Sequence, residues 1–363
     1  VRSSAASDVY KRQTLMLLRT KYRFNGYIHV KAIPGAPDEL LSRAGYLADR
    51  VSINLELPTA QSLSKLAPNK SFKTILEPME KITGTIAANR LALGKDARME
   101  RSSINRYLTG SIFNQNGTDN GQAALSGTQR TALESGDKLS LPAVSKDMCV
   151  KRPFAPAGQS TQMIIGATPE TDLTLIRTTQ HLYKNYDLKR VFYSAYIPLN
   201  EDSALPQLDA DVPLLREHRL YQADWLLRFY GFQADELLSE SRPNFNEQLD
   251  PKCDWAIRHL GQFPVEVQNA SYDMLLRIPG IGPKSARRIV ETRRYAKLDF
   301  DILKKIGVVL KRAHYFITCN GRMMYRIPIE ESYITSCLTD DNHKENWVIT
   351  HQNEKYHQLS LFE

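Results

Sequence analysis

The first half of the chain alternates between the hydrophobic periods of strands and of helices. In GYIHVKAI, residues 26–33, apolar and polar side chains alternate, as in a strand whose two faces meet different surroundings. Strands of the same kind are expected at residues 50–57, 160–168 and 189–199. Helical patterns occupy residues 15–23, 38–48, 72–93 and 170–186. Strands that alternate with helices in this way predict an α/β fold with a parallel sheet.

The second half has a different pattern. Beyond Pro206 the apolar spacing is wholly helical, with helices expected at 214–229 and 254–260. A polar segment at about 109–145, rich in Gly, Asn, Ser and Thr, interrupts the α/β half and is interpreted as an insertion or disordered loop. Because four strands are fewer than a closed barrel needs, the α/β half is predicted to be a partial (β/α) barrel, incomplete at its N-terminus.

The first residues of the chain, VRSSAASDVYKRQ at 1–13, are polar and have no hydrophobic period. They resemble translated sequencing-adapter sequence at the broken end of a reading frame, and we leave them out of the fold prediction. On this interpretation they are an artefact, the natural protein begins upstream of Thr14, and an N-terminal portion of the barrel is missing.

Composition narrows the class of protein. The hydrophobic and charged fractions, 42% and 24%, are those of a globular protein. No apolar run approaches the roughly 20 residues of a membrane span, and no signal-peptide pattern opens the chain, so a cytoplasmic location is expected. The cysteines are too far apart for a disulfide framework or a CxxC metal site, and we interpret them as small buried residues. They are Cys149, Cys253, Cys319 and Cys337.

The positive charge is concentrated in one stretch. The chain has a net charge of +8, whereas residues 277–326 alone contain thirteen Lys and Arg against three acidic residues, a net charge of +10. The remainder is therefore slightly acidic. A basic block on an otherwise nearly neutral protein is typical of a polyanion-binding surface, and a merely solvated surface is the alternative.

The same stretch contains a helix–turn–helix pattern, LLRIPGIGPKSARRIVETRR, at residues 275–294. Its turn glycines allow backbone amides to approach a phosphate closely, and the helix that follows offers its N-terminal N–H groups to the same anion. The PGIG core followed by Ala286 resembles the helix-hairpin-helix family, which grips the DNA backbone; a helical turn without DNA is the alternative. The residues expected to bind DNA are Gly280, Ile281, Gly282, Lys284, Ser285, Arg287 and Arg288.

A degraded copy of the hairpin follows at a spacing of 27 residues, in LKKIGVVLKRA at 303–313. Gly307 takes the place of Gly280, but Val309 stands where the second glycine, Gly282, would be. We therefore expect a paired hairpin unit whose second copy is structural and does not bind phosphate.

Base-excision glycosylases also contain this hairpin, followed by a catalytic Asp. Asp299 and Asp301 lie in the corresponding region, but they directly precede a predicted helix, where an N-cap also explains them. A helix-hairpin-helix glycosylase or lyase therefore stays as an alternative enzyme. A non-catalytic DNA-binding adaptor is the alternative without chemistry.

Five segments follow one another in a specific order: FNGYIHVKAIPGA, SINLELPT, AGQSTQMIIGATPETD, VFYSAYIPL and the hairpin. Together they resemble a radical S-adenosylmethionine (SAM) family of DNA modification and repair proteins whose members end in a helix-hairpin-helix. The resemblance spans Thr14 to Glu363. It implies a radical SAM barrel, a [4Fe–4S] cluster and SAM as cofactors, and a radical modification or repair of a DNA base or sugar.

By that resemblance, SAM binds at the ends of the strands. Asn54 and Glu56 match the pattern that contacts the SAM ribose, because residues two apart on a strand share one face. Tyr196 and Ile197 would flank the adenine. For Asn54 and Glu56 the alternative is a strand-end polar pair that contacts solvent or a neighbouring loop. For Tyr196 and Ile197 the alternative is core packing.

Other features of the resemblance are less complete. Gly166, Thr168 and Glu170 resemble the glycine-containing region after the fifth strand, although Gln162 stands where the first glycine is expected and the Glu is one position late. The cluster motif CxxxCxxC is absent, and a cluster needs thiolate ligands. Either the motif lies in the missing portion or this is a catalytically silent relative, and the chain as given is expected to be inactive.

The chain ends in HQLSLFE, residues 357–363. Gln358-Leu359-Ser360-Leu361-Phe362 resembles the short motif with which bacterial polymerases and repair proteins dock on the DNA sliding clamp. Leu361 and Phe362 can enter an apolar pocket, Leu359 fills the space beside them, and Gln358 supplies a directional hydrogen bond. A terminal strand that packs on its own domain is the alternative.

These expectations divide the chain into five parts. They are an adapter-derived artefact at 1–13, a partial radical SAM barrel at 14–205, a helical extension at 206–267, a helix-hairpin-helix DNA-binding domain at 268–318, and a C-terminal segment with the clamp-like motif at 319–363.

Overall fold

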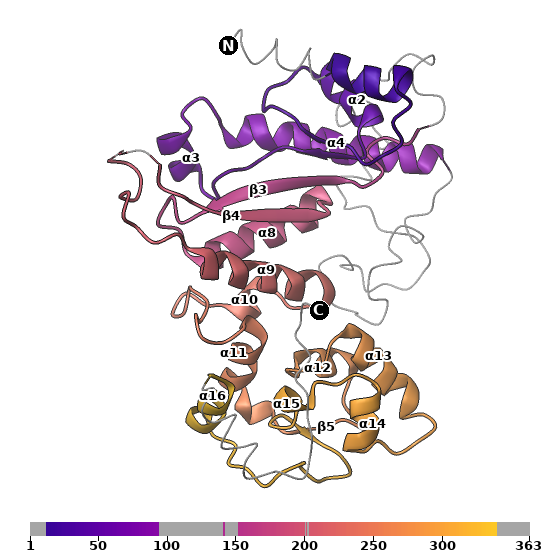
Figure 1. Cartoon of the computed structure of the whole chain (residues 1–363), viewed down its shortest axis with the longest axis vertical. Coiled ribbons are helices and arrows are strands. Elements are labelled where there is room, and N and C mark those ends of the chain that lie inside the picture. Colours follow the sequence, from indigo (N-terminus) through magenta and orange to yellow (C-terminus); the bar gives the residue numbers. More distant parts are fainter. Residues whose placement is uncertain (1–11, 94–140, 142–151, 200, 202, 340–363) are drawn as a thin grey trace. The chain divides into compact units, whose positions relative to one another are not determined.

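The computed structural model describes residues 12–93, 141, 152–199, 201 and 203–339, and it divides the chain into two compact units (Figure 1). The first unit is Val1–Phe245 and the second is Asn246–Glu363. Nearly all of the polar segment at 109–145 lies outside the described residues, as does the clamp-like motif at the C-terminus.

The first unit is built on a parallel four-stranded sheet in the order β1-β2-β3-β4 (Figure 1). The strands are β1 (His29–Lys31), β2 (Arg50–Ser52), β3 (Gln159–Ile165) and β4 (Arg190–Ala195). The predicted α/β class and parallel sheet are therefore confirmed. Within the described residues the sheet is open, and no closed barrel is formed.

All four strands are shorter than their sequence patterns predict, β1 and β2 most of all. The run at 50–57 is a regular strand only to Ser52, although Glu56 regains the sheet through its N–H, which donates to Gln162 O at 2.9 Å. Glu56 itself has a left-handed backbone, with φ of 68°. The alternation of side chains continues past the point at which regular pairing stops, so hydrophobic period alone overestimates the strand.

Helices connect the strands of the first unit. Their bounds are α2 (Asp38–Leu47), α3 (Ala60–Leu66), α4 (Phe72–Ala92), α8 (Asp172–Tyr186), α9 (Leu214–Phe229) and α10 (Ala234–Leu237), preceded by the π-helix η1 (Leu17–Lys21). The longer helices follow the predicted ranges closely. The short helices α3 and α10 have too few residues to show a helical period, and the sequence did not predict them.

A buried ion pair stabilises this unit beneath β4. Tyr183 on α8 donates its hydroxyl hydrogen to Asp224 on α9, and Arg228 lies 2.7 Å from the same carboxyl group. Burial raises the pKa of Asp224, and the guanidinium of Arg228 opposes that rise. The side chain of Asp224 is only 1% exposed, so its charge depends on these two partners.

The second unit consists of short helices and a two-stranded parallel pairing of β5 (Val265–Glu266) with β6 (Ile317–Thr318). Its helices are α11 (Pro251–Arg258), η3 (Leu260–Gln262), α12 (Tyr272–Arg277), α13 (Pro283–Thr292), α14 (Phe300–Lys305), α15 (Leu310–Ala313) and α16 (Glu331–Thr339). Glu266 joins the two strands to the turn that follows β6, because its carboxylate accepts hydrogen bonds from Thr318 Oγ1 at 3.0 Å and from Gly321 N at 2.8 Å.

Helix α11 begins three residues before the predicted start at Asp254. Asp250 caps it by accepting hydrogen bonds from the N–H groups of Lys252 and Cys253, and Pro251 occupies the first turn. The Asp-Pro pair is a start signal that the apolar spacing does not contain.

The cysteines are partly as expected. Cys253 and Cys319 are buried, whereas Cys337 is only half-buried, so the prediction of burial is wrong for Cys337, which lies on the partly exposed helix α16. Cys149 lies outside the described residues. Among the described helices, none is long and apolar enough to cross a membrane.

Candidate nucleic-acid interface

The second unit contains two consecutive helical hairpins. The first joins α12 to α13 through residues 278–282, and the second joins α14 to α15 through residues 306–309 (Figure 1). Each turn contains a glycine with a left-handed backbone, Gly280 with φ of 83° and Gly307 with φ of 92°. The 27-residue spacing in the sequence thus corresponds to a repeated turn.

The two hairpins pack against each other through these glycines. Val309 N donates to Gly280 O at 2.9 Å, and Ser285 Oγ donates to Gly307 O at 2.7 Å. A Cβ atom on Gly280 would lie 2.4 Å from Val309 O, which is closer than non-bonded atoms approach. Gly280 is therefore required both by its φ angle and by the neighbouring hairpin.

The start of α13 leaves backbone donors without acceptors. No described residue accepts a hydrogen bond from the N–H of Gly282, Lys284 or Ser285, and Pro283 between them has no N–H. The first turn of α13 contains no acidic residue. Unpaired N–H groups at the positive end of a helix can bind an anion, and phosphate is well matched to them.

The second hairpin lacks an equivalent site. Val309 occupies the position of Gly282 in the repeat, and its N–H donates to Gly280 O. Arg312 corresponds to Ser285, and its guanidinium binds Asp250 at 2.8 Å. These contacts agree with the expectation that the second hairpin stabilises the first and does not itself bind phosphate.

The seven residues predicted to bind DNA contribute in different ways. Lys284 and Arg287 are exposed, and among the described residues Arg287 pairs only with Glu291, at a long distance of 3.6 Å. Arg288 is also exposed, but its Nη1 donates to Ile306 O at 3.0 Å and so helps to join the hairpins.

The side chains of Ile281 and Ser285 do not face solvent. Ile281 is 1% exposed and packs in the core, and Ser285 is buried with its hydroxyl bound to Gly307 O. At both positions the backbone, and not the side chain, is the group that could meet a phosphate. The sequence placed them next to the turn correctly but could not show which way each side chain points.

Further basic residues extend the positive surface. Arg294, Lys297 and Lys305 are exposed and have no side-chain partner among the described residues. Arg293 behaves differently, because its guanidinium donates to Ala270 O at 2.6 Å and fixes the turn after α13. The basic block therefore includes both free cations and cations that hold the fold together.

A buried lysine lies beneath the first hairpin. Lys252 on α11 is 9% exposed, and its Nζ donates to Ile281 O at 2.5 Å. Lys252 was not among the residues predicted from the sequence. The available signal was a lysine directly after the Asp-Pro start of a helix whose other residues are mostly apolar.

Asp299, one of the two candidate glycosylase residues, is a helix cap. Its Oδ1 accepts a hydrogen bond from Ile302 N at 2.7 Å at the start of α14. Asp301 is exposed in the first turn of the same helix, where a negative charge is favourable. Both positions thus have a structural role that requires no chemistry.

Comparison with known proteins supports the hairpin. The family model described as "Helix-hairpin-helix motif" matches residues 265–292, which extend from β5 to the end of α13. No curated protein matches the chain. No solved structure matches it either.

The first unit brings the residues expected to bind SAM to one edge of the sheet, where its parallel strands end. Asn54 is 4% exposed, and its Nδ2 donates to Gln162 Oε1 at 3.1 Å. Glu56 lies between two lysines, 3.5 Å from Lys31 and 3.4 Å from Lys70. Both side chains already have partners, which a ribose would have to displace.

The residues that follow β3 lie at the same edge. Gly166 has a left-handed backbone, with φ of 87°. Glu170 accepts a hydrogen bond from Thr59 Oγ1 at 2.8 Å. Burial acts to raise the pKa of Glu170, but hydrogen bonds from the hydroxyl groups of Ser62, Thr168 and Thr59 outweigh it, so the pKa is lowered. Glu170 is therefore a charged group that connects two strand ends.

The end of β4 completes this edge. Tyr196 N donates to Ile165 O at 2.8 Å and is half-buried, whereas Ile197 is 58% exposed. Core packing, one of the two explanations open for this pair, therefore does not apply to Ile197. An exposed isoleucine at a strand end is available to contact an apolar ring.

The described residues do not fit an iron–sulfur cluster. The described cysteines, Cys253, Cys319 and Cys337, are all in the second unit, whereas the sheet belongs to the first. Burial raises the pKa of Cys253 well above its usual value and that of Cys319 to about 12, which disfavours thiolates. Among the described residues, no three His, Cys, Asp or Glu side chains gather as metal ligands.

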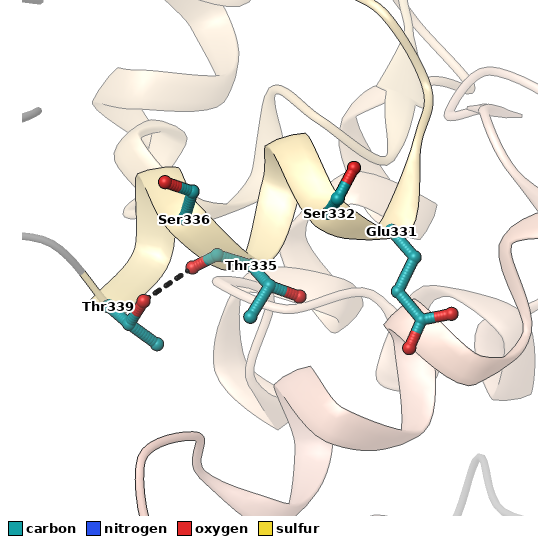
Figure 2. A pocket seen from close by; sticks show the side chains of 5 residues that line it. All are labelled: Glu331, Ser332, Thr335, Ser336 and Thr339. Atoms are coloured by element: carbon teal, nitrogen blue, oxygen red, sulfur yellow. Dashed lines mark hydrogen bonds between the residues drawn. The ribbon is translucent and has the colours of Figure 1, made fainter.

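A pocket is present beside α16, lined by Glu331, Ser332, Thr335, Ser336 and Thr339 (Figure 2). Ser332 and Ser336 extend from one side of the helix in this view, and the other three extend from the other side. The hydroxyl of Thr339 is bound to Thr335 O at 2.8 Å. These groups do not converge on one point, and the carboxylate of Glu331 disfavours a phosphate there.

Proposed function

We propose that the second unit binds DNA through its phosphate backbone, with little preference for sequence, and that the first hairpin is the contact. The observation that carries this proposal is the set of three unaccepted N–H groups at the start of α13, beside the exposed ammonium of Lys284. Contacts to phosphate fix position and orientation but do not read bases. The match of the helix-hairpin-helix motif to residues 265–292 supports the same function.

A charge reversal at the hairpin tests this proposal. Lys284→Glu combined with Arg287→Glu should weaken binding to duplexes of any sequence and reduce the slope of log affinity against log salt by about 2. The matched control is Lys65→Glu with Lys73→Glu, which changes the net charge equally at two exposed sites of the first unit. Equal losses in both double variants would mean that only overall charge matters and that the hairpin is not the contact.

We further propose that the first unit belongs to an enzyme of the radical SAM class that modifies or repairs DNA. Support comes from the ordered sequence resemblance and from the open parallel sheet, whose carboxyl edge gathers Asn54, Glu56, Glu170 and Tyr196. The bound SAM and cluster would supply the radical chemistry, while these residues would hold and orient the nucleoside part of SAM.

The test of this second proposal begins with the genomic sequence upstream of the Thr14 codon. An in-frame CxxxCxxC motif there, followed by iron incorporation and 5′-deoxyadenosine formation by the longer protein after anaerobic reconstitution, is the expected result. Absence of both from the longer protein would contradict it. The chain as given is expected to yield no 5′-deoxyadenosine.

A third proposal concerns residues outside the described part of the chain. We propose that Gln358, Leu359, Leu361 and Phe362 dock on a bacterial DNA sliding clamp, which would hold a hairpin without sequence preference near replicating DNA. A peptide of residues 355–363 should bind the clamp. The same peptide with Leu361→Ala and Phe362→Ala should not, and equal behaviour of the two peptides would exclude the motif.

A further inference from the structure

Lys252 lies directly behind the anion site of the first hairpin. Its Nζ donates to Ile281 O at 2.5 Å from the buried side of the turn. In a trans peptide the C=O of one residue and the N–H of the next point in opposite directions. A hydrogen bond that holds the Ile281 carbonyl inward therefore directs the Gly282 N–H outward, to the side on which a phosphate would bind.

The same helix end also supports the second hairpin. Asp250 caps α11, and its Oδ2 accepts a hydrogen bond from Arg312 Nη1 at 2.8 Å. Arg312 belongs to α15, and Ile281 belongs to the turn before α13. Two side chains at the start of α11 thus contact both hairpins: the carboxylate of Asp250 binds α15, and the amine of Lys252 binds the turn before α13.

The surroundings of Lys252 make its charge sensitive to pH. Burial lowers the pKa of its amine to about 7. Asp250 and Cys253 act to raise that pKa, whereas Arg277 and Arg312 act to lower it. The amine therefore gains and loses its proton near neutrality, unlike an exposed lysine.

We propose that Lys252 is a positioning residue for the phosphate site, and that DNA binding by the first hairpin takes up a proton at this amine. The protonated amine holds the Ile281–Gly282 peptide by a charge-assisted hydrogen bond and adds a positive charge behind the bound anion. This inference rests on the proposed binding of DNA and assigns a pH dependence to it.

The direction of the effect follows from linkage. A bound phosphate favours the protonated amine, so the complex holds more protons than the free protein and affinity falls as the pH rises through neutrality. For two unit charges about 8 Å apart at an effective dielectric constant of about 40, the change is about five-fold. It should be largely complete between pH 6 and pH 8.5.

The experiment measures fluorescence anisotropy of a labelled mixed-sequence duplex with the full chain, from pH 6 to pH 8.5 at constant ionic strength. The wild type should lose affinity about five-fold across this range. Lys252→Met, which neither donates nor carries charge, should bind weakly with a flat profile. Lys252→Arg, which keeps its charge throughout, should also give a flat profile.

Calorimetry in two buffers of different ionisation enthalpy provides a second measurement on the wild type alone. Proton uptake on binding at about pH 7.5 is expected, and it needs no variant to fold correctly. A thermal melt, and the fluorescence of Trp255 in a background that carries Trp225→Phe and Trp347→Phe, show whether Lys252→Met is folded.

The outcomes separate the two proposals. A wild type that binds DNA with a flat profile and no proton uptake leaves the DNA-binding function intact and overturns the role of Lys252. The same holds if a folded Lys252→Met variant keeps the full pH dependence. A wild type that binds no DNA at any pH overturns both.

Discussion

Gly280→Ala should be one of the most destabilising single-methyl additions in the second unit. Gly280 has φ of 83°, and an added Cβ would lie 2.4 Å from Val309 O and 3.1 Å from Ala313 N. Both neighbouring atoms are backbone atoms of the second hairpin, so neither can rotate away. The methyl group therefore forces the two hairpins apart.

The magnitude follows from three contributions. A left-handed backbone costs an alanine about 1–2 kcal/mol. Overpacking adds about 1–3 kcal/mol, and loss of the Val309 N to Gly280 O hydrogen bond adds about 1 kcal/mol. We expect the free energy of unfolding of the second unit to fall by about 3–6 kcal/mol, with a loss of DNA affinity as the turn shifts.

Gly321→Ala is the matched control. Gly321 lies in the same unit and has φ of 73°, but a Cβ there would meet nothing within 4 Å. It should lose only the conformational contribution, about 1–2 kcal/mol. The difference between the two variants isolates the contact between hairpins.

Urea unfolding followed by tryptophan fluorescence measures this difference. The chain has three tryptophans, and Trp225→Phe with Trp347→Phe leaves Trp255, which is buried in α11, as a reporter of the second unit alone. Equal midpoints for the two alanine variants would refute the packing of the hairpins through Gly280.

Three further predictions concern individual carboxylates and the buried amine. Asp299→Ala should destabilise the second unit by about 1 kcal/mol through loss of the α14 cap, whereas Asp299→Asn should be nearly neutral. Loss of a base-excision activity in Asp299→Asn or Asp301→Asn would instead favour the glycosylase alternative. Asp224→Ala should lower the melting temperature of the first unit and reduce its free energy of unfolding by about 3–5 kcal/mol, because it leaves Arg228 buried without its carboxylate. Asp235→Ala, which removes an exposed partner of Arg177, should change that free energy by less than about 1 kcal/mol. Folding lowers the pKa of Lys252 from 10.5 to about 7, so the unfolded chain binds more protons than the folded chain between pH 7 and pH 10.5. The free energy of unfolding, measured at several pH values in this range, should therefore rise with pH by at most about 1.4 kcal/mol per pH unit. Lys252→Met should abolish this slope.

Sequence patterns predicted the elements of this protein better than they predicted their ends. The 3.6-residue period placed α9 at Leu214–Phe229 as observed, because sixteen residues contain several turns of repeating signal. The start of α11 depended on one capping residue, Asp250, and the left-handed backbone of Glu56 interrupts a run whose side chains alternate as in a strand. The period of apolar residues along the chain does not reveal single caps or backbone angles.

The candidate site was predictable where it depends on glycine and not where it depends on burial. The turn at Gly280 and its repeat at Gly307 were found from spacing, since only glycine adopts those φ angles without strain. The inward orientation of Ser285 and the position of Lys252 beneath Ile281 result from contacts between segments far apart in the chain. A single sequence contains no direct signal of such contacts.

Gly282 and Val309 occupy equivalent positions in the two hairpins, but their N–H groups differ in hydrogen bonding, so the two hairpins are not equivalent. Repeated hairpins with two equivalent sites could hold both strands of a duplex at once, related by the symmetry of the repeat. In the second hairpin the N–H of Val309 donates to Gly280 O, whereas in the first hairpin the N–H of Gly282 has no acceptor among the described residues. The two copies therefore have different roles: the second supports the first, and the first is the proposed contact with phosphate. Under the proposed function, the first copy alone offers free amides, so a duplex is expected to meet this pair of hairpins through one of its phosphate strands. Restoring glycine at Val309 would not create a second site, because the amide would still be bound to Gly280.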